Sequence, residues 1–287
     1  MLPWIPAAVC AYVLLSLAGA VALHRLPREP VRDAPGWGCV QDLVIPAAGK
    51  GYLELWRVIP EKPLPLTAVF VHGLTRNRDM MTPRARVFGA LGATTVMASA
   101  RDHGGSSPHA LMDVNRLAED VDTVVSWVGE PVILYGHSAG AGAAMLFASR
   151  RPDMVRALVL ESAYPYPWRA FVRFMASTNP VAGRVFGPGV VAWMEILHQG
   201  SLARSSPLRL AGELSMPVLL IHGDEDEKFP LSWARRLKRA FPRACLFVAR
   251  GAGHADCPRA PGYEAAVRSF LADAVGLGKG FETPAIH

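Results

Sequence analysis

Short apolar runs recur along the chain, separated by stretches in which apolar residues follow helical spacing. A continuous apolar run of roughly four to eight residues is typical of a strand that is buried on both faces of a sheet. Such runs occupy 67–71, 94–98, 132–136, 155–160, 218–221 and, more briefly, 246–248. Two further runs, 39–45 and 53–59, flank a turn at 47–51 and predict two more strands.

The stretches between these strands predict helices. Within 111–128, the apolar residues Leu117, Val121, Val124 and Val128 fall at helical spacing. The other predicted helices occupy 78–91, 139–150, 231–240 and 263–275. Strands that alternate with helices form parallel sheets that are covered on both faces. The pattern therefore predicts an α/β fold with a doubly wound, mostly parallel sheet.

One interval, 162–212, interrupts this alternation, because it is too long for a plain connection between two strands. Pro180 and the Gly-Pro-Gly sequence at 187–189 are expected to divide it into short helices. Its aromatic residues are Tyr164, Tyr166, Trp168, Phe171, Phe174, Phe186 and Trp193. We interpret the interval as a helical cap over the carboxyl edge of the sheet. Its aromatic residues either pack within the cap or contact a bound ligand, and either arrangement makes the cleft below apolar.

The segment 5–23 is almost wholly apolar and carries no charge. As a helix it spans about 28 Å at 1.5 Å per residue, which matches the hydrocarbon core of a bilayer. Arg25, Arg28 and Arg32 follow it, so the positive-inside rule places the rest of the chain in the cytoplasm. One alternative is a signal peptide cleaved at the small residues 18–20, which would give an exported protein, although a basic n-region is missing. A buried helix of the folded domain is the other.

These patterns set the expected domain organisation and fit the composition. Residues 1–26 form a transmembrane anchor or signal sequence, 27–37 a linker, 38–162 and 213–276 the sheet with its helices, 163–212 the cap, and 277–287 a C-terminal tail. The chain has 287 residues, of which 51% are hydrophobic and 19% charged. This balance predicts a sizeable core and excludes a disordered chain.

The net charge of +6 is mild for this length, and no nucleic-acid-binding motif accompanies it. The basic residues gather only at 235–239, which we interpret as the solvated face of a helix or, alternatively, as a site for anionic lipid headgroups. The four cysteines, Cys10, Cys39, Cys245 and Cys257, are too scattered for a disulfide framework, and no C-x-x-C pair predicts a zinc or redox site.

A G-x-S-x-G motif occupies 136–140, with the sequence Gly-His-Ser-Ala-Gly. It lies between a predicted strand and a predicted helix, which is the context in which this motif presents a nucleophilic serine. The sharp turn strains the backbone of Ser138 and lifts its hydroxyl above the edge of the sheet. Glycines at both ends avoid side chains that would clash in the turn. The following helix directs its N-terminal amides at the site, where negative charge develops during acyl transfer.

A serine nucleophile needs a base, usually a histidine that a carboxylate holds in the correct tautomer. His254 follows the last predicted strand, so it is expected at the same edge of the sheet as Ser138. Asp224 and Asp226 follow the preceding strand to that edge, and Glu161 ends an earlier one. Asp224 lies in the turn itself, where a side chain faces solvent or caps local amides. We therefore favour Asp226 as the acid and keep Glu161 as the alternative.

Three further histidines have structural interpretations. His72 and His222 end buried strands beside glycines, and no second ligand stands at metal-binding spacing from either. We interpret both as hydrogen-bonded structural residues. His137 lies inside the serine motif, and we assign it to packing rather than proton transfer.

The chain resembles the α/β hydrolases of the serine esterase, lipase and aminopeptidase group. The matching segments, in family order, are 72–74 (His-Gly-Leu), 102–106 (Asp-His-Gly-Gly-Ser), 136–140, 223–226 (Gly-Asp-Glu-Asp) and 251–254 (Gly-Ala-Gly-His). The resemblance implies an α/β-hydrolase fold with Ser138, Asp226 and His254 as a catalytic triad. It also implies an oxyanion hole formed by the backbone N–H groups of Leu74 and Ala139. At 102–106 an arginine–glycine pair is more usual, which loosens the subfamily assignment. The N-terminal span resembles membrane-anchored members that act on acyl lipids or acylated proteins.

The expected activity is hydrolysis of a carboxylic ester or thioester with an apolar acyl group through an acyl-enzyme, without a cofactor. The expected partners are a small acyl ester or lipid and, through the N-terminal segment, a membrane. A serine aminopeptidase is one alternative, which an acidic pocket residue for the substrate amine would favour. A catalytically silent, membrane-tethered binding module is the other. The sequence leaves the acyl chain length and the oligomeric state open.

Overall fold

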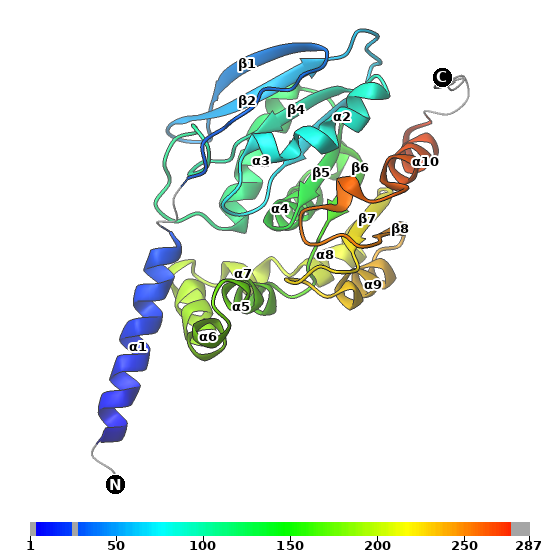
Figure 1. Ribbon diagram of the computed structural model, residues 1–287. Helices are drawn as coiled ribbons and strands as arrows, with labels where there is room; N and C mark the ends of the chain where they lie inside the picture. The colour runs from blue at the N-terminus through cyan, green and yellow to red at the C-terminus, as the bar shows by residue number, and fades with distance from the viewer. Residues whose placement is uncertain (1–3, 25–27, 277–287) are drawn as a thin grey trace.

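Eight strands form one sheet in the order β1-β2-β4-β3-β5-β6-β7-β8 (Figure 1). The strands are β1 (Cys39–Pro46), β2 (Tyr52–Ile59), β3 (Thr67–Val71), β4 (Thr94–Ala98), β5 (Val132–His137), β6 (Val155–Glu161), β7 (Val218–Gly223) and β8 (Ala244–Ala249). β2 pairs antiparallel with both β1 and β4, and every other pairing is parallel. This computed structural model describes residues 4–24 and 28–276, so Arg25 and the predicted tail 277–287 lie outside the described residues. The predicted doubly wound, mostly parallel sheet is confirmed.

Helices cover both faces of the sheet. Successive side chains of a strand point to opposite faces, so a strand that is apolar throughout presents an apolar surface on each. In β5, Val132 and Leu134 enter the core cluster under α3 (Val114–Val128) and α4 (Ala139–Arg150). Ile133 and Tyr135 enter the opposite cluster, which is shared with α2 (Thr82–Ala90) and α10 (Tyr263–Val275). α9 (Leu231–Ala240) packs on the α4 side through Leu237. The continuous apolar runs of the sequence are explained by this burial on both sides.

Capping residues set two helix boundaries that differ from the predicted ones. The helix predicted at 111–128 begins at Val114, because the side chain of Asp113 accepts a hydrogen bond from the Arg116 N–H and acts as the N-cap. The helix predicted at 78–91 is divided into a short 3-10 helix, Arg78–Met81, followed by α2. Asn77 caps the 3-10 helix by accepting a hydrogen bond from the Asp79 N–H.

Four helices lie between β6 and β7: α5 (Pro167–Thr178), α6 (Pro180–Leu197), α7 (Ser201–Arg204) and α8 (Pro207–Glu213). The predicted break at 187–189 is wrong, because α6 continues through Pro188. α6 packs against α5 on one side and α1 on the other. That packing outweighs the local cost of a proline inside a helix, which is about 3 kcal/mol. α8 packs against α4 and α9 rather than over the carboxyl edge.

The N-terminal helix α1 (Trp4–Leu23) projects away from the sheet and lies beside α6 (Figure 1). It is long and apolar enough to cross a membrane, a property that a signal sequence shares. Ser16 and Ala20 are its buried residues, and Ala20 packs with Val190 and Met194 of α6. Several of its large apolar side chains, including Val9, Leu14 and Leu15, are exposed.

Candidate active site

Ser138 lies in the turn between β5 and α4, with φ 53° and ψ −116°. A positive φ is costly for a residue with a side chain, and the surroundings hold this one in place. The Ser138 N–H donates to the carbonyl of Glu161 at 2.9 Å. A Cβ at Gly136 would approach the Gly140 carbonyl oxygen within 2.5 Å, and one at Gly140 would approach the Val71 oxygen within 2.4 Å. The two motif glycines are therefore required by the close packing of the turn.

The structure brings together the three residues singled out from the sequence. The hydroxyl of Ser138 lies 3.0 Å from Nε2 of His254, and Nδ1 of His254 lies 2.9 Å from Oδ2 of Asp226. The hydrogen-bond pattern assigns the tautomer, with Nδ1–H donating to Asp226 and Nε2 accepting from Ser138. Burial alone would raise the pKa of Asp226, but the hydrogen bond and charge of His254 and the Phe229 N–H outweigh it and lower the pKa. The carboxylate therefore remains ionised beside the imidazole.

Backbone and ring contacts fix the position of His254. Its carbonyl oxygen accepts hydrogen bonds from the Ser162 hydroxyl and from Nε2 of His137, each at 2.9 Å. The ring of Phe229 meets the imidazole edge-on, with ring centroids 5.0 Å apart. The sequence pattern did not single out Phe229, whose only signal is its position three residues after Asp226. His137 therefore supports the His254 loop, as its assignment to packing predicted.

The other two carboxylates considered for the acid bind elsewhere. Asp224 accepts a hydrogen bond from the Gly251 N–H at 2.7 Å. Glu161 is fully buried and forms an ion pair with Arg84, with N···O distances of 2.5 and 2.6 Å. Neither of these contacts involves the imidazole of His254. Asp226 is the carboxylate that the fold directs at this ring.

The loop after β3 lies directly beside Ser138. A Cβ at Gly73 would come within 2.9 Å of Nδ1 of His137 and 3.2 Å of the Ser138 Cβ, so this close approach favours glycine. Leu74 follows Gly73, and Thr75 adopts a positive φ of 65° with its N–H directed at Nε2 of His103, 3.3 Å away. Ala139 is the first residue of α4, where backbone N–H groups have no partner within the helix. Gly73, which precedes Leu74, therefore lies against Ser138, which precedes Ala139.

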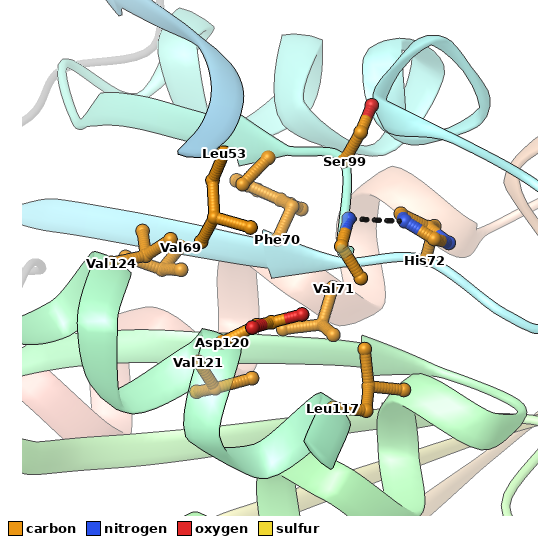
Figure 2. Close-up of a pocket in the computed structure, with 12 residues that line it drawn as sticks. Leu53, Val69, Phe70, Val71, His72, Ser99, Leu117, Asp120, Val121 and Val124 are labelled. Atoms are coloured by element: carbon orange, nitrogen blue, oxygen red, sulfur yellow. Dashed lines mark hydrogen bonds between the residues drawn. The ribbon is translucent and has the colours of Figure 1, made fainter. Parts of the chain in front are cut away.

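His72 and His222 make structural contacts. Nδ1–H of His72 donates to the Gly73 carbonyl at 2.8 Å, and Nε2 accepts from the Ala100 N–H at 3.0 Å (Figure 2). Burial lowers the pKa of His72 to about 3, so the ring stays neutral. Nε2–H of His222 donates to the Phe229 carbonyl at 2.9 Å. Among residues 4–24 and 28–276, no three His, Cys, Asp or Glu side chains are grouped so as to hold a metal ion.

Two cavities differ sharply in size. The one in Figure 2 lies between β3 and α3, measures about 20 Å³ and is lined mainly by core residues such as Val69, Val121 and Val124. It holds roughly one water molecule and no substrate. A second cavity of about 820 Å³ lies between α1 and the cap helices α5 and α6 and reaches Thr75. That volume falls within the usual range of roughly 300–1,000 Å³ for ligand sites.

Several solved structures share this architecture. A bacterial membrane phospholipase A superposes with a TM-score of 0.67 over 96% of this chain and 94% of its own, at 18% identity. The esterase Pf2001 of Pyrococcus furiosus superposes with a TM-score of 0.69 over 87% of this chain and 99% of its own, at 19% identity. At these identities the likeness concerns the fold alone.

Sequence relatives agree with the fold. The monoacylglycerol lipase of Mycolicibacterium smegmatis is 26% identical over 205 residues, which cover 59% of this chain and 73% of that protein. The sn-1-specific diacylglycerol lipase ABHD11 of Mus musculus is 31% identical over 99 residues, covering 34% of this chain and 32% of its own. Relatives with these names support an ester hydrolase of the α/β type. A model of the alpha/beta hydrolase family matches residues 68–266, from β3 into α10, and the chain therefore belongs to the α/β hydrolase family.

Proposed function

We propose that this protein is a serine hydrolase that cleaves a carboxylic ester or thioester with an apolar acyl group. The observation that carries the proposal is the unbroken hydrogen-bond chain from Ser138 through His254 to Asp226, with distances of 3.0 and 2.9 Å. Such a chain lets the histidine accept the serine proton while the carboxylate stabilises the imidazolium that forms.

The reaction proceeds in two acyl-transfer steps. Nε2 of His254 takes the Ser138 proton as the serine oxygen attacks the carbonyl carbon, and the backbone N–H groups of Leu74 and Ala139 bind the resulting oxyanion. His254 then donates the proton to the departing alcohol or thiol, which leaves an acyl-serine. Water, deprotonated by the same imidazole, releases the acid and restores the serine.

The charges around the cavity favour an ester over a peptide with a free amine. An aminopeptidase site requires an unpaired acidic group to bind the substrate amine. Glu29 is the acidic residue that lines the cavity of about 820 Å³. Its carboxylate forms an ion pair with Arg76 at 2.9 Å, so it is already occupied. Most of the remaining lining is apolar, which suits an acyl chain.

We also propose that α1 anchors the enzyme in a membrane. Its length, its lack of charge and its outward-facing apolar side chains support this role. Arg28 and Arg32 follow the helix, so the positive-inside rule favours a cytoplasmic catalytic domain.

Replacing the nucleophile tests the proposed function. Ser138→Ala is expected to abolish hydrolysis of p-nitrophenyl esters and labelling by a fluorophosphonate, because it removes the attacking oxygen. Ser149→Ala is the matched control, since that hydroxyl only donates to the Leu146 carbonyl within α4. The control is expected to keep wild-type activity and labelling. Full esterase activity in Ser138→Ala would end the serine-hydrolase proposal.

A further inference from the structure

The cavity of about 820 Å³ has walls from parts of the chain that are far apart in sequence. Leu15, Gly19 and Leu23 of α1 form one wall. The opposite wall comes from the cap and contains Phe174, Met175, Thr178, Asn179, Ala182, Gly183, Phe186, Gly187 and Val190. The helix proposed above as a membrane anchor therefore also lines a cavity of ligand size.

Close contacts hold α1 against the cap. A Cβ at Gly19 would approach the side chain of Val190 within 2.9 Å, and a Cβ at Gly189 would approach the Tyr12 hydroxyl within 2.9 Å. The ring of Tyr12 stacks on Phe186 with centroids 5.6 Å apart. Small residues at such positions let two helix backbones approach closely. The wall formed by α1 is therefore a packed part of the fold.

The segment after α1 is attached to the catalytic core. Arg28 forms an ion pair with Asp102 at 2.8 Å and donates to the Ser106 carbonyl at 2.9 Å. The carbonyls of Glu29 and Pro30 accept hydrogen bonds from the Asn77 side chain. These contacts attach residues 28–30 to the loops after β3 and β4.

Polarity varies along the cavity. Its charged residues, Arg28 and Glu29, lie with Thr75 at the end nearest the site, while the walls from α1 and the cap are mainly apolar. A small adjoining cavity shares Leu23, Arg28 and Thr75 with it and is also lined by Leu74. The polar end therefore borders the predicted oxyanion hole. This gradient fits an amphiphile whose ester group lies at the Thr75 end and whose chain runs between α1 and α6.

We propose that α1 forms one wall of the acyl-binding site, and that the long acyl chain of a membrane lipid ester enters this site from the bilayer between α1 and the cap. The proposal rests on the proposed function, because the ester must reach Ser138. The cavity wall from Leu15 to Leu23 extends roughly 12 Å at 1.5 Å per residue. It adjoins the outward-facing apolar surface that α1 presents to lipid. A chain can thus pass from bilayer to cavity without crossing water.

Photocrosslinking of the unaltered full-length protein tests this placement. A fluorophosphonate with a long alkyl chain and a terminal diazirine is allowed to react in maltoside micelles, then irradiated, and crosslinked peptides are identified by mass spectrometry. We expect Ser138 to carry the phosphonate and the chain end to crosslink to peptides of both α1 and α6. Labelling of Ser138 with crosslinks to the cap alone would overturn the α1 wall. Failure to label Ser138 at all would instead refute the proposed function.

Substitutions in the two walls give an independent test. Leu15→Trp and Ala182→Trp add bulk to the cavity from α1 and from α6 at positions that are exposed. Each is expected to lower the ratio of kcat/KM for a dodecanoate ester to that for a butyrate ester by about tenfold or more, because buried methylene contacts are lost.

Matched controls lie next to each position on the same helices. Leu14 and Val181 are 65% and 74% exposed and do not line the cavity, so Leu14→Trp and Val181→Trp should keep the wild-type ratio. An effect of Ala182→Trp without an effect of Leu15→Trp would confine the acyl site to the cap and overturn the role of α1. Equal losses for both esters in both wall variants, with Ser138 labelling retained, would also overturn it.

Discussion

Asp226 combines a structural and a proposed catalytic role in one side chain. Oδ1 accepts hydrogen bonds from the backbone N–H groups of Lys228 and Phe229, and Oδ2 faces His254 at 2.9 Å. The two backbone contacts hold the carboxylate in the orientation in which Oδ2 faces the imidazole. Asp224, two residues earlier, instead caps the Gly251 N–H. Asp226 therefore faces the imidazole, while Asp224 joins the loop after β7 to the loop after β8, which carries His254.

Replacing Asp226 by Asn keeps the shape and removes the charge. Asp226→Asn is expected to lower kcat for ester hydrolysis by several orders of magnitude, because the imidazole loses its tautomer control and the stabilisation of its cation. The analogous change in a serine protease costs about 10⁴-fold. Steady-state kinetics on a p-nitrophenyl ester measure the effect.

Asp224→Asn is the control for that substitution, and we expect a much smaller loss because Asp224 accepts a hydrogen bond from the Gly251 N–H of the loop after β8 and does not contact the imidazole. A near-normal kcat in Asp226→Asn would show that this carboxylate does not serve His254. If Glu161→Gln remained folded and lost most of its activity while Asp226→Asn did not, Glu161 would be the acid of the triad.

At the scale of elements, a buried ion pair ties helix α2 to the carboxyl end of β6. Arg84 of α2 donates to both oxygens of Glu161, and its guanidinium also donates to the Ala255 carbonyl at 2.9 Å. The Tyr135 hydroxyl donates to the same carboxylate at 2.5 Å. One arginine therefore links α2, β6 and the residue that follows His254. The pair lies underneath the site and supports the loop that carries the histidine.

Breaking this pair is expected to destabilise the fold. Glu161→Gln leaves the buried Arg84 without its counter-charge, and such changes cost about 3–5 kcal/mol of unfolding free energy. Urea denaturation followed by tryptophan fluorescence measures the loss.

Glu264→Gln is the matched control for the buried pair. It removes an exposed ion pair with Arg268 within α10, and exposed pairs contribute at most about 1 kcal/mol. Equal unfolding free energies for Glu161→Gln and the wild type would contradict a structural role for the buried pair.

At the scale of the whole molecule, the cap lies between the N-terminal helix α1 and the sheet. Helix α6 contacts both α1 and α5. Helices α5 to α8 form the segment of chain that connects β6 to β7. Any shift of α1 relative to the sheet therefore has to change the cap. Helix α1 is therefore joined to the cap through packed contacts as well as through the chain that follows it.

The anchor proposal predicts that the full-length protein stays with the membrane fraction after washing with alkaline carbonate. A helix that spans the bilayer resists this treatment because its apolar side chains stay in the hydrocarbon region. Immunoblotting of pellet and supernatant measures the partition, with a peripheral membrane protein as the control that must be released. A mature N-terminus near Val21, found by N-terminal sequencing, would instead establish a cleaved signal peptide.

The linear sequence contained most of the fold and the core of the candidate site. A strand that is buried on both faces needs apolar side chains at every position, so runs such as 132–136 can be recognised as strands. Ser138 can be recognised by its flanking glycines, because its sharp turn tolerates few other residues there. His254 and Asp226 could be placed at the same edge because parallel strands end together. These features depend on local spacing and strand order, which the sequence records directly.

The cavity and the contacts around it could be decided only by the tertiary structure. The continuation of α6 through Pro188 depends on packing against α1 and α5, and no local propensity encodes that packing. The same holds for Phe229 against His254, and for Leu15 opposite Ala182 across the cavity. In each case the two residues come from segments that are brought together only by the packing of whole elements. A local pattern predicts which elements form, and the docking of those elements decides which side chains meet.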